Sequence, residues 1–208
     1  MQPKAYKLGH QEFYGKKFLV DHRTYVPTQE TEFLVDALLR EIKNGEIVID
    51  VGTGCGNIAV TIKLEKPDVK MFAGDISQDA LEVARENSLI TKADVAFFKS
   101  NYVDNNCLPS PDYIIANLPW GTPKTILHKG GKVELEHMPK VSLFHPEGPL
   151  GAQIALLKSI LNRKWKPKVF LETGLLSKEQ VSEIIPKELD WEYRKQGNYS
   201  ITIINFRK

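Results

Sequence analysis

The chain has 208 residues, of which 42% are hydrophobic and 26% charged, a balance typical of one globular domain with a sizeable core. The net charge of +2 neither requires nor excludes a nucleic-acid partner, and the absence of a long apolar run argues against a membrane span or a signal peptide. Of the two cysteines, Cys55 lies in a glycine-rich stretch, so we expect no structural disulfide and a reducing, cytoplasmic location.

The first 28 residues are basic and aromatic and are expected to form an arm that precedes a main domain at residues 29–208. Residues 13–20 predict a short hairpin that turns at Gly15. A helix is expected over residues 30–43, where apolar side chains recur at helical spacing before Asn44 and Gly45.

Short apolar runs then alternate with helical patterns. Strands are expected at residues 47–51, 69–73, 94–98, 113–116, 169–172, 191–194 and 199–206, and helices at 58–64, 78–87, 153–161 and 178–185. This alternation predicts an α/β fold with a seven-stranded, mostly parallel sheet, helices on both faces and an antiparallel C-terminal strand. The longest irregular stretch, residues 121–149, follows a strand and is expected to face the substrate.

Three alternating glycines follow the first predicted strand of this sheet, in Asp50-Val51-Gly52-Thr53-Gly54-Cys55-Gly56. Glycines let the backbone turn tightly and approach a ligand closely. Dinucleotide-binding folds use the longer spacing G-x-G-x-x-G to seat a pyrophosphate, so the shorter spacing favours a ligand such as S-adenosylmethionine. Asp75 ends the next strand, at the place where an acid binds ribose hydroxyls. The structural alternative is a plain turn with Asp75 as a helix cap.

The end of the third strand is expected to reach the adenine, where Asn101 could bond to the exocyclic amine and Tyr102 could pack on the ring; the alternative is an ordinary loop. The complete set of predicted cofactor-binding residues is Asp50, Gly52, Thr53, Gly54, Gly56, Asp75, Ile76, Asn101, Tyr102 and Asn117. No metal site is predicted, because His22, His128, His137 and His145 match no usual ligand spacing.

The fourth strand ends in Asn117-Leu118-Pro119-Trp120, the predicted catalytic segment. An amide nitrogen is a poor nucleophile, and it improves when acceptors hold its hydrogens and align its lone pair on a methyl group. The side-chain oxygen of Asn117 and the backbone carbonyl of Leu118 could be these acceptors, while Trp120 could stack on a flat amide or base. Such a site works mainly by positioning. The structural alternative is a strand-to-turn transition with a buried tryptophan.

At this point the chain resembles the release-factor glutamine methyltransferases of the HemK/PrmC type, from about residue 11 onward. The resemblance covers the hairpin at residues 13–20, Pro27-Thr28-Gln29-Glu30-Thr31-Glu32 for P-R-P-E-T-E, the glycine loop, and Asp75-Ile76-Ser77. It extends to Asn117-Leu118-Pro119-Trp120 for N-P-P-Y, to residues 139–151, and to Glu172-Thr173-Gly174 for E-x-G.

The resemblance implies a class I, Rossmann-like methyltransferase that uses S-adenosylmethionine and acts on a glutamine of a protein, such as a translation release factor. Leu118 stands in place of a proline, Trp120 in place of a tyrosine, and Asn101 where an aspartate is common. Typical bacterial members carry a helical N-terminal domain that helps to hold the release factor, and this chain has no room for it. We therefore expect cofactor binding to be retained, and a need for a small partner protein is one hypothesis.

Two alternatives remain open. The enzyme could methylate adenine N6 or guanine N2 in RNA or DNA, because such enzymes have a similar site, and the basic residues available to phosphates are Lys16, Lys17, Arg23, Lys124, Lys129 and Lys132. The chain could instead be a cofactor-binding adaptor that has lost catalysis through Leu118.

Overall fold

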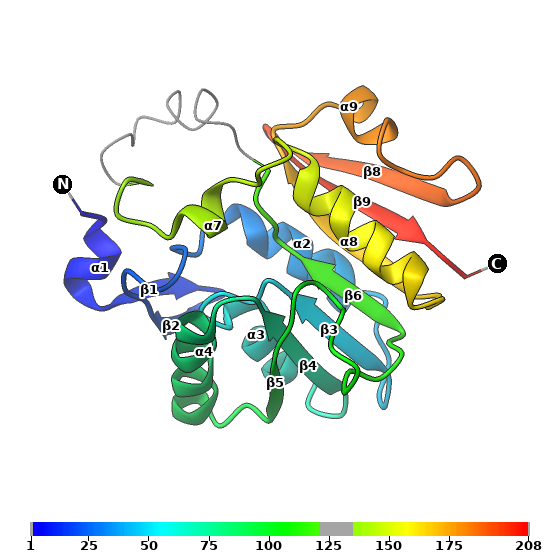
Figure 1. Cartoon of the computed structure of the whole chain (residues 1–208). Helices are drawn as coiled ribbons and strands as arrows, with labels where there is room; N and C mark the ends of the chain where they lie inside the picture. Colours follow the sequence, from blue (N-terminus) through cyan, green and yellow to red (C-terminus); the bar gives the residue numbers. More distant parts are fainter. Residues whose placement is uncertain (1, 121–134, 208) are drawn as a thin grey trace.

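The computed structural model describes residues 2–120 and 135–207 and has a seven-stranded sheet at its centre (Figure 1). The strand order is β5-β4-β3-β6-β7-β9-β8. The first five run parallel, and β9 runs antiparallel to both of its neighbours, which confirms the predicted sheet. The strands are β3 (Ile47–Val51), β4 (Lys70–Asp75), β5 (Val95–Lys99), β6 (Tyr113–Ala116), β7 (Lys168–Gly174), β8 (Asp190–Gln196) and β9 (Tyr199–Asn205).

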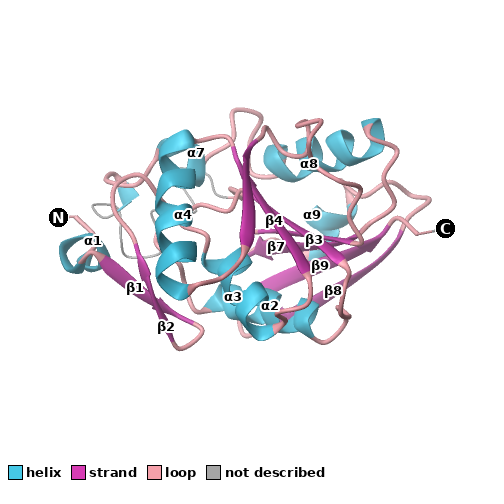
Figure 2. Cartoon of the chain, turned by 90° about the horizontal axis from the view of Figure 1, so that it is seen from below, coloured by secondary structure: helices cyan, strands magenta, loops and turns pink. Residues whose placement is uncertain are grey.

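Helices cover both faces of the sheet because each central strand is apolar on both sides (Figure 2). Side chains of α2 and α3 pack with one face, and those of α8 and α9 pack with the other. Ser77 caps α4 by accepting a hydrogen bond from Ala80 N. These helices are α2 (Glu30–Leu39), α3 (Asn57–Glu65), α4 (Gln78–Thr91), α8 (Gly151–Asn162) and α9 (Lys178–Ser182).

Several local features differ from the sequence prediction, among them α4, which extends to Thr91, and α9, which ends at Ser182. The helix expected over residues 30–43 ends at Leu39, because the following residues turn the chain into β3 through Gly45 at φ 83°. The short helices α1 (Lys4–Leu8) and α7 (Lys140–Leu143) were not predicted, since so few residues show no helical periodicity. Of the irregular stretch expected over residues 121–149, residues 121–134 lie outside the described residues.

The N-terminal hairpin consists of β1 (His10–Phe13) and β2 (Lys16–Leu19), and it turns at Tyr14 and Gly15 as expected. Both turn residues have positive φ, the geometry of a type I′ turn. Phe13 and Phe18 are fully buried in the same core as α2 and α3. The hairpin is therefore packed into the main fold.

The sheet places a ligand site at the ends of β3 and β6. These strands are parallel neighbours although β4 and β5 separate them in the sequence. The chain leaves β3 toward one edge of the sheet and leaves β6 toward the other, and open α/β sheets bind ligands outside the carboxyl ends at such a point. Among the described residues, no helix is long and apolar enough to cross a membrane.

Candidate active site

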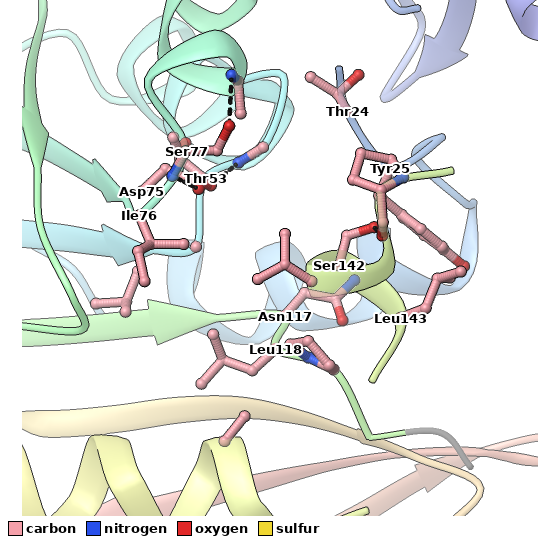
Figure 3. A pocket seen from close by; sticks show the side chains of 18 of the residues that line it. Thr24, Tyr25, Thr53, Asp75, Ile76, Ser77, Asn117, Leu118, Ser142 and Leu143 are labelled. Carbon is pink, nitrogen blue, oxygen red and sulfur yellow. Dashed lines mark hydrogen bonds between the residues drawn. The ribbon is translucent and has the colours of Figure 1, made fainter. Parts of the chain in front are cut away.

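A cavity of about 690 Å³ lies at the carboxyl ends of β3, β4, β5 and β6. Figure 3 shows Asp75 and Ser77 on one side of it, Tyr25 on the other, and Asn117 and Leu118 between them. All predicted cofactor-binding and catalytic residues line this cavity except Asp50 and Gly56. The structure thus brings together residues that four different strands deliver to one edge of the sheet.

The glycine loop has positive φ at each of its three glycines, which explains the residue type at these positions. The loop is held by Gly52 N and Thr53 N, which donate to Gly74 O at 2.8 and 3.0 Å. A Cβ at Gly56 would lie 3.1 Å from the Cβ of Ala84, so a glycine at this position lets α4 pack closely against the loop. Gly52 and Gly54 are the two that face the cavity.

Asp50 lies behind the loop, where it does not line the cavity. Its carboxylate is fully buried and accepts a hydrogen bond from Thr53 Oγ1 at 2.7 Å. Desolvation by burial raises the pKa of Asp50 to about 7, against the lowering effect of the Thr53 bond. Asp50 therefore supports the shape of the loop from the core side.

Asp75 lines the cavity and is oriented by the backbone. Its Oδ2 accepts from Gly54 N at 2.9 Å and its Oδ1 accepts from Ser77 N at 2.9 Å. Burial raises its pKa, although these backbone bonds oppose the shift. Each carboxylate oxygen can accept a further hydrogen bond, as two vicinal hydroxyls would require.

These residues fit S-adenosylmethionine. Gly52 has no side chain, so a ligand can lie close to the backbone of the loop. A Cβ at this position would lie 2.9 Å from Leu118 Cδ2 and would narrow the cavity. Asp75 offers acceptors to ribose hydroxyls, and the half-exposed Ile76, with Tyr102, offers apolar surface to a flat ring. Asn101 lies beside them on the cavity wall.

The segment after β6 forms what we call the acceptor end of the cavity, residues 117–120 with Thr31 and Glu172. Asn117 Nδ2 donates to Thr31 Oγ1 at 3.0 Å, and Thr31 Oγ1 donates to Glu172 Oε2 at 2.7 Å. Leu118 is buried against the glycine loop, and it joins the cofactor side to the acceptor end.

Trp120 lies against the backbone of Gly174 at the end of β7. A Cβ built at Gly174 would lie 2.3–2.6 Å from three atoms of the indole. Gly174 also has a φ of 59°, which side chains rarely adopt. Only glycine accommodates the indole in this position.

The sequence analysis gave no role in the site to the polar residues that surround the acceptor end. Glu30, Glu172, Tyr25 and Tyr199 all line the cavity. A hydrogen bond joins Tyr199 to Glu30, and burial together with nearby carboxylates raises the pKa of both tyrosines, that of Tyr25 to about 12. One signal was available: Glu172 lies in the apolar run of β7, and a buried carboxylate needs a partner.

The described basic residues that were considered for phosphate contacts are either held in ion pairs or do not line the cavity. Lys16 is paired with Glu65 at 2.8 Å, and Arg23 is paired with Asp21 at 2.7 Å. Arg23 is the one lysine or arginine among the described residues that line the cavity. Lys17 has no place on the described cavity wall, and three further candidates lie outside the described residues, namely Lys124, Lys129 and Lys132.

Sequence comparison shows that residues 28–133 match the family described as "Methyltransferase small domain". The chain is 32% identical over 190 residues to a release factor glutamine methyltransferase of Streptococcus pneumoniae, covering 90% of this chain and 67% of that protein. It is 43% identical over 122 residues to the protein of the same name from Neisseria gonorrhoeae, covering 57% of this chain and 44% of that protein. The chain thus spans about half to two thirds of the length of these relatives.

Structure comparison finds the same fold in proteins of low sequence identity. The catalytic domain of human Mettl16, solved in complex with the MAT2A 3'UTR hairpin 6, matches with a TM-score of 0.67 and 14% identity. The match covers 94% of this chain and 77% of that one. At this identity the likeness supports the fold alone.

Proposed function

Since this chain belongs to the release factor glutamine methyltransferase family, we propose that it transfers a methyl group to the side-chain amide nitrogen of a glutamine in a protein. The observation that carries the proposal is the position of Asn117, which lines the cavity beside the glycine loop with its amide nitrogen turned to Thr31. The amide oxygen on the other branch is then available to a substrate.

The cofactor, S-adenosylmethionine, supplies an electrophilic methyl group on a sulfonium. The chain's own residues do the positioning. Asn117 Oδ1 and the main-chain carbonyl of Leu118 accept the hydrogens of the incoming amide and so align its lone pair. Trp120 packs on the flat face of the amide. The glycine loop and Asp75 hold the cofactor, and Asn117 contacts both partners.

The charge of the cavity supports a protein substrate over a nucleic acid. Carboxylates of Glu30 and Glu172 line the acceptor end, and they would repel a phosphate backbone. Arg23, which also lines the cavity, is already paired with Asp21. A neutral side-chain amide carries no such electrostatic cost.

The test is an incubation with methyl-labelled cofactor, in which a release factor fragment that contains glutamines competes with total RNA. We expect the label in the protein fraction, on a glutamine side chain located by mass spectrometry of peptides. Label in nucleic acid alone would contradict the proposal and favour a base N-methyltransferase.

Asn117→Ala is the diagnostic variant, and Asn162→Ala, at the exposed end of α8, is its matched control. The first change is expected to lower kcat on the order of 100-fold while calorimetry still detects cofactor binding. The control should leave both quantities unchanged. A wild-type protein that binds cofactor but methylates neither protein nor RNA would instead be an adaptor.

A further inference from the structure

Three side chains from distant parts of the sequence form a chain of hydrogen bonds at the acceptor end, buried at Thr31 and Glu172 and half-buried at Asn117. Asn117 follows β6, Thr31 lies in the first turn of α2, and Glu172 lies on β7. The bonds run from Asn117 Nδ2 to Thr31 Oγ1 at 3.0 Å and from Thr31 Oγ1 to Glu172 Oε2 at 2.7 Å. Thr31 and Glu172 are 1% and 4% exposed, so little of either side chain is open to solvent.

The chain of bonds has one direction because a hydroxyl has a single hydrogen. Thr31 Oγ1 gives its hydrogen to Glu172 Oε2. The hydroxyl oxygen can then only accept, and of the two branches of the Asn117 amide only the NH₂ group can donate to it. If the amide were rotated by half a turn, Asn117 Oδ1 would face the lone pairs of Thr31 Oγ1.

We propose that Thr31 and Glu172 are positioning residues, which fix the Asn117 amide with its oxygen toward the substrate. This inference rests on the proposed function, because it matters only if Asn117 Oδ1 receives a hydrogen of the methyl acceptor. The carboxylate of Glu172 fixes the orientation of the Thr31 O–H bond, and the Thr31 oxygen fixes the orientation of the Asn117 amide. Neither residue needs to touch the substrate.

The first test reads the orientation without any methyl acceptor. The side-chain NH₂ signals of Asn117 are assigned by their loss in Asn117→Asp, and their exchange with solvent is followed by NMR in cofactor-bound protein. Thr31→Val removes the hydroxyl at nearly constant volume and is expected to speed this exchange on the order of tenfold. Thr31→Ser keeps the hydroxyl and should restore slow exchange.

Two further variants complete the set. Glu172→Gln replaces a pure acceptor by a group that can donate or accept, so the Asn117 amide can take either orientation and its NH₂ signals should split or broaden. Thr61→Val is the matched control, because Thr61 is fully buried on α3 and its hydroxyl has no hydrogen-bond partner among the described residues. It should change neither the signals nor turnover.

The second test is kinetic and uses the release factor fragment. In Thr31→Val we expect kcat to fall on the order of 10- to 100-fold, with the Kd of the cofactor nearly unchanged and with rescue by Thr31→Ser. If Thr31→Val does not fold, kcat and the Kd of the cofactor are compared between wild type and Glu172→Gln instead. Unchanged NH₂ exchange, or an unchanged kcat in both Thr31→Val and Glu172→Gln, would overturn the inference.

The two tests separate this inference from the proposed function. If the wild-type protein gives no turnover on the fragment but Asn117 shows the expected exchange pattern, the direction of the amide stands and the assigned substrate fails. If turnover is present but the exchange pattern does not respond to Thr31, the substrate stands and the positioning role fails.

Discussion

Gly174 illustrates how the acceptor end depends on an absent side chain as much as on those present. The indole of Trp120 occupies the space that a Cβ at Gly174 would fill. The backbone at this position also has positive φ. Glycine is therefore favoured at position 174 for two reasons, the positive φ of the backbone and the space that the indole of Trp120 requires.

Gly174→Ala is expected to displace Trp120 and to lower methyl transfer on the order of tenfold or more, because the flat acceptor loses its stacking surface. Gly197→Ala carries the backbone strain alone, since Gly197 has the same φ of 59° but open space around it, and the difference between the two variants is the steric effect of Trp120. Both variants should lose about 1 kcal/mol of stability through the left-handed backbone. Steady-state kinetics and urea unfolding measure the two effects, and equal kinetics in both variants would argue against the role of Trp120.

Asp50 provides a test of pH dependence. Burial holds its pKa at about 7 in the folded protein, above the unfolded value of about 3.9. Between these values the folded carboxyl keeps a proton that the unfolded chain has lost, so the free energy of unfolding falls as pH rises, by up to about 1.4 kcal/mol per pH unit. The loss is complete above pH 7.

Asp50→Asn keeps an acceptor for Thr53 but cannot ionise, so the slope of stability against pH should become less steep between about pH 4 and 7. Urea unfolding at several pH values, in wild type and variant, measures the difference. Parallel curves for the two proteins would show that Asp50 does not titrate in this range.

The sequence predicted the residues whose position at the cavity follows from local chain geometry. The three glycines, Asp75 and Asn117 each follow a recognisable strand, and all but Gly56 line the cavity. Thr31 and Glu172 could not be connected to Asn117, because their contacts join segments that only the folded sheet brings together. Asp50 was expected at the cofactor and lies behind the loop, since the side chains of a strand alternate between faces.

At the scale of elements, a single residue of α4 joins the N-terminal hairpin to the glycine loop. Asn87 Oδ1 accepts from Leu19 N at 2.7 Å. Its Nδ2 donates to Leu19 O at 3.0 Å and to Cys55 O at 2.8 Å. The hairpin thus holds the loop through α4, although neither β1 nor β2 reaches the cavity.

Asn87→Ala is expected to cost about 3 kcal/mol of stability, because it leaves buried polar groups of Leu19 and Cys55 without partners. It should also weaken cofactor binding several-fold by loosening the loop. Thr91→Ala on the same helix is the control, as its hydroxyl bonds mainly to the helix's own Asn87 O. Chemical unfolding measures the stability, and calorimetry measures the cofactor affinity. An Asn87→Ala protein with wild-type cofactor affinity would show that the hairpin does not support cofactor binding by the loop.

The prediction of elements succeeded where a segment carried a clear apolar pattern. The strands at residues 47–51 and 113–116 were located to the residue, because continuous apolar runs mark buried parallel strands. The ends of α2 and the short α7 depend on where the chain turns to reach the cavity, and local composition does not record that.

At the scale of the whole molecule, a net charge of +2 conceals an uneven distribution. The acceptor end is lined by carboxylates. Of the described basic candidates, Lys16 and Arg23 are held in ion pairs, and Lys17 does not line the cavity. Among the described residues, the charged groups at the acceptor end are therefore acidic. That arrangement suits an uncharged acceptor.

Affinity for the release factor fragment should accordingly change less than about tenfold between 50 and 200 mM salt, whereas proteins that make six to ten phosphate contacts lose about 10³–10⁵ in affinity. Fluorescence anisotropy with labelled fragment and labelled RNA measures the two slopes side by side. A steep slope for the RNA, together with tighter binding than the fragment, would favour the nucleic-acid alternative.

The position of β9 between β7 and β8 has a consequence for the order in which the protein assembles. β8 precedes β9 in the chain but, in the part of the chain that the structure describes, pairs with no strand except β9, so it cannot join the sheet until β9 has inserted beside β7. The strands that carry the glycine loop, Asp75 and Asn117 are all synthesised earlier. A nascent chain can therefore form its cofactor half first, and it completes the surroundings of Glu172 only when Tyr199 arrives with β9.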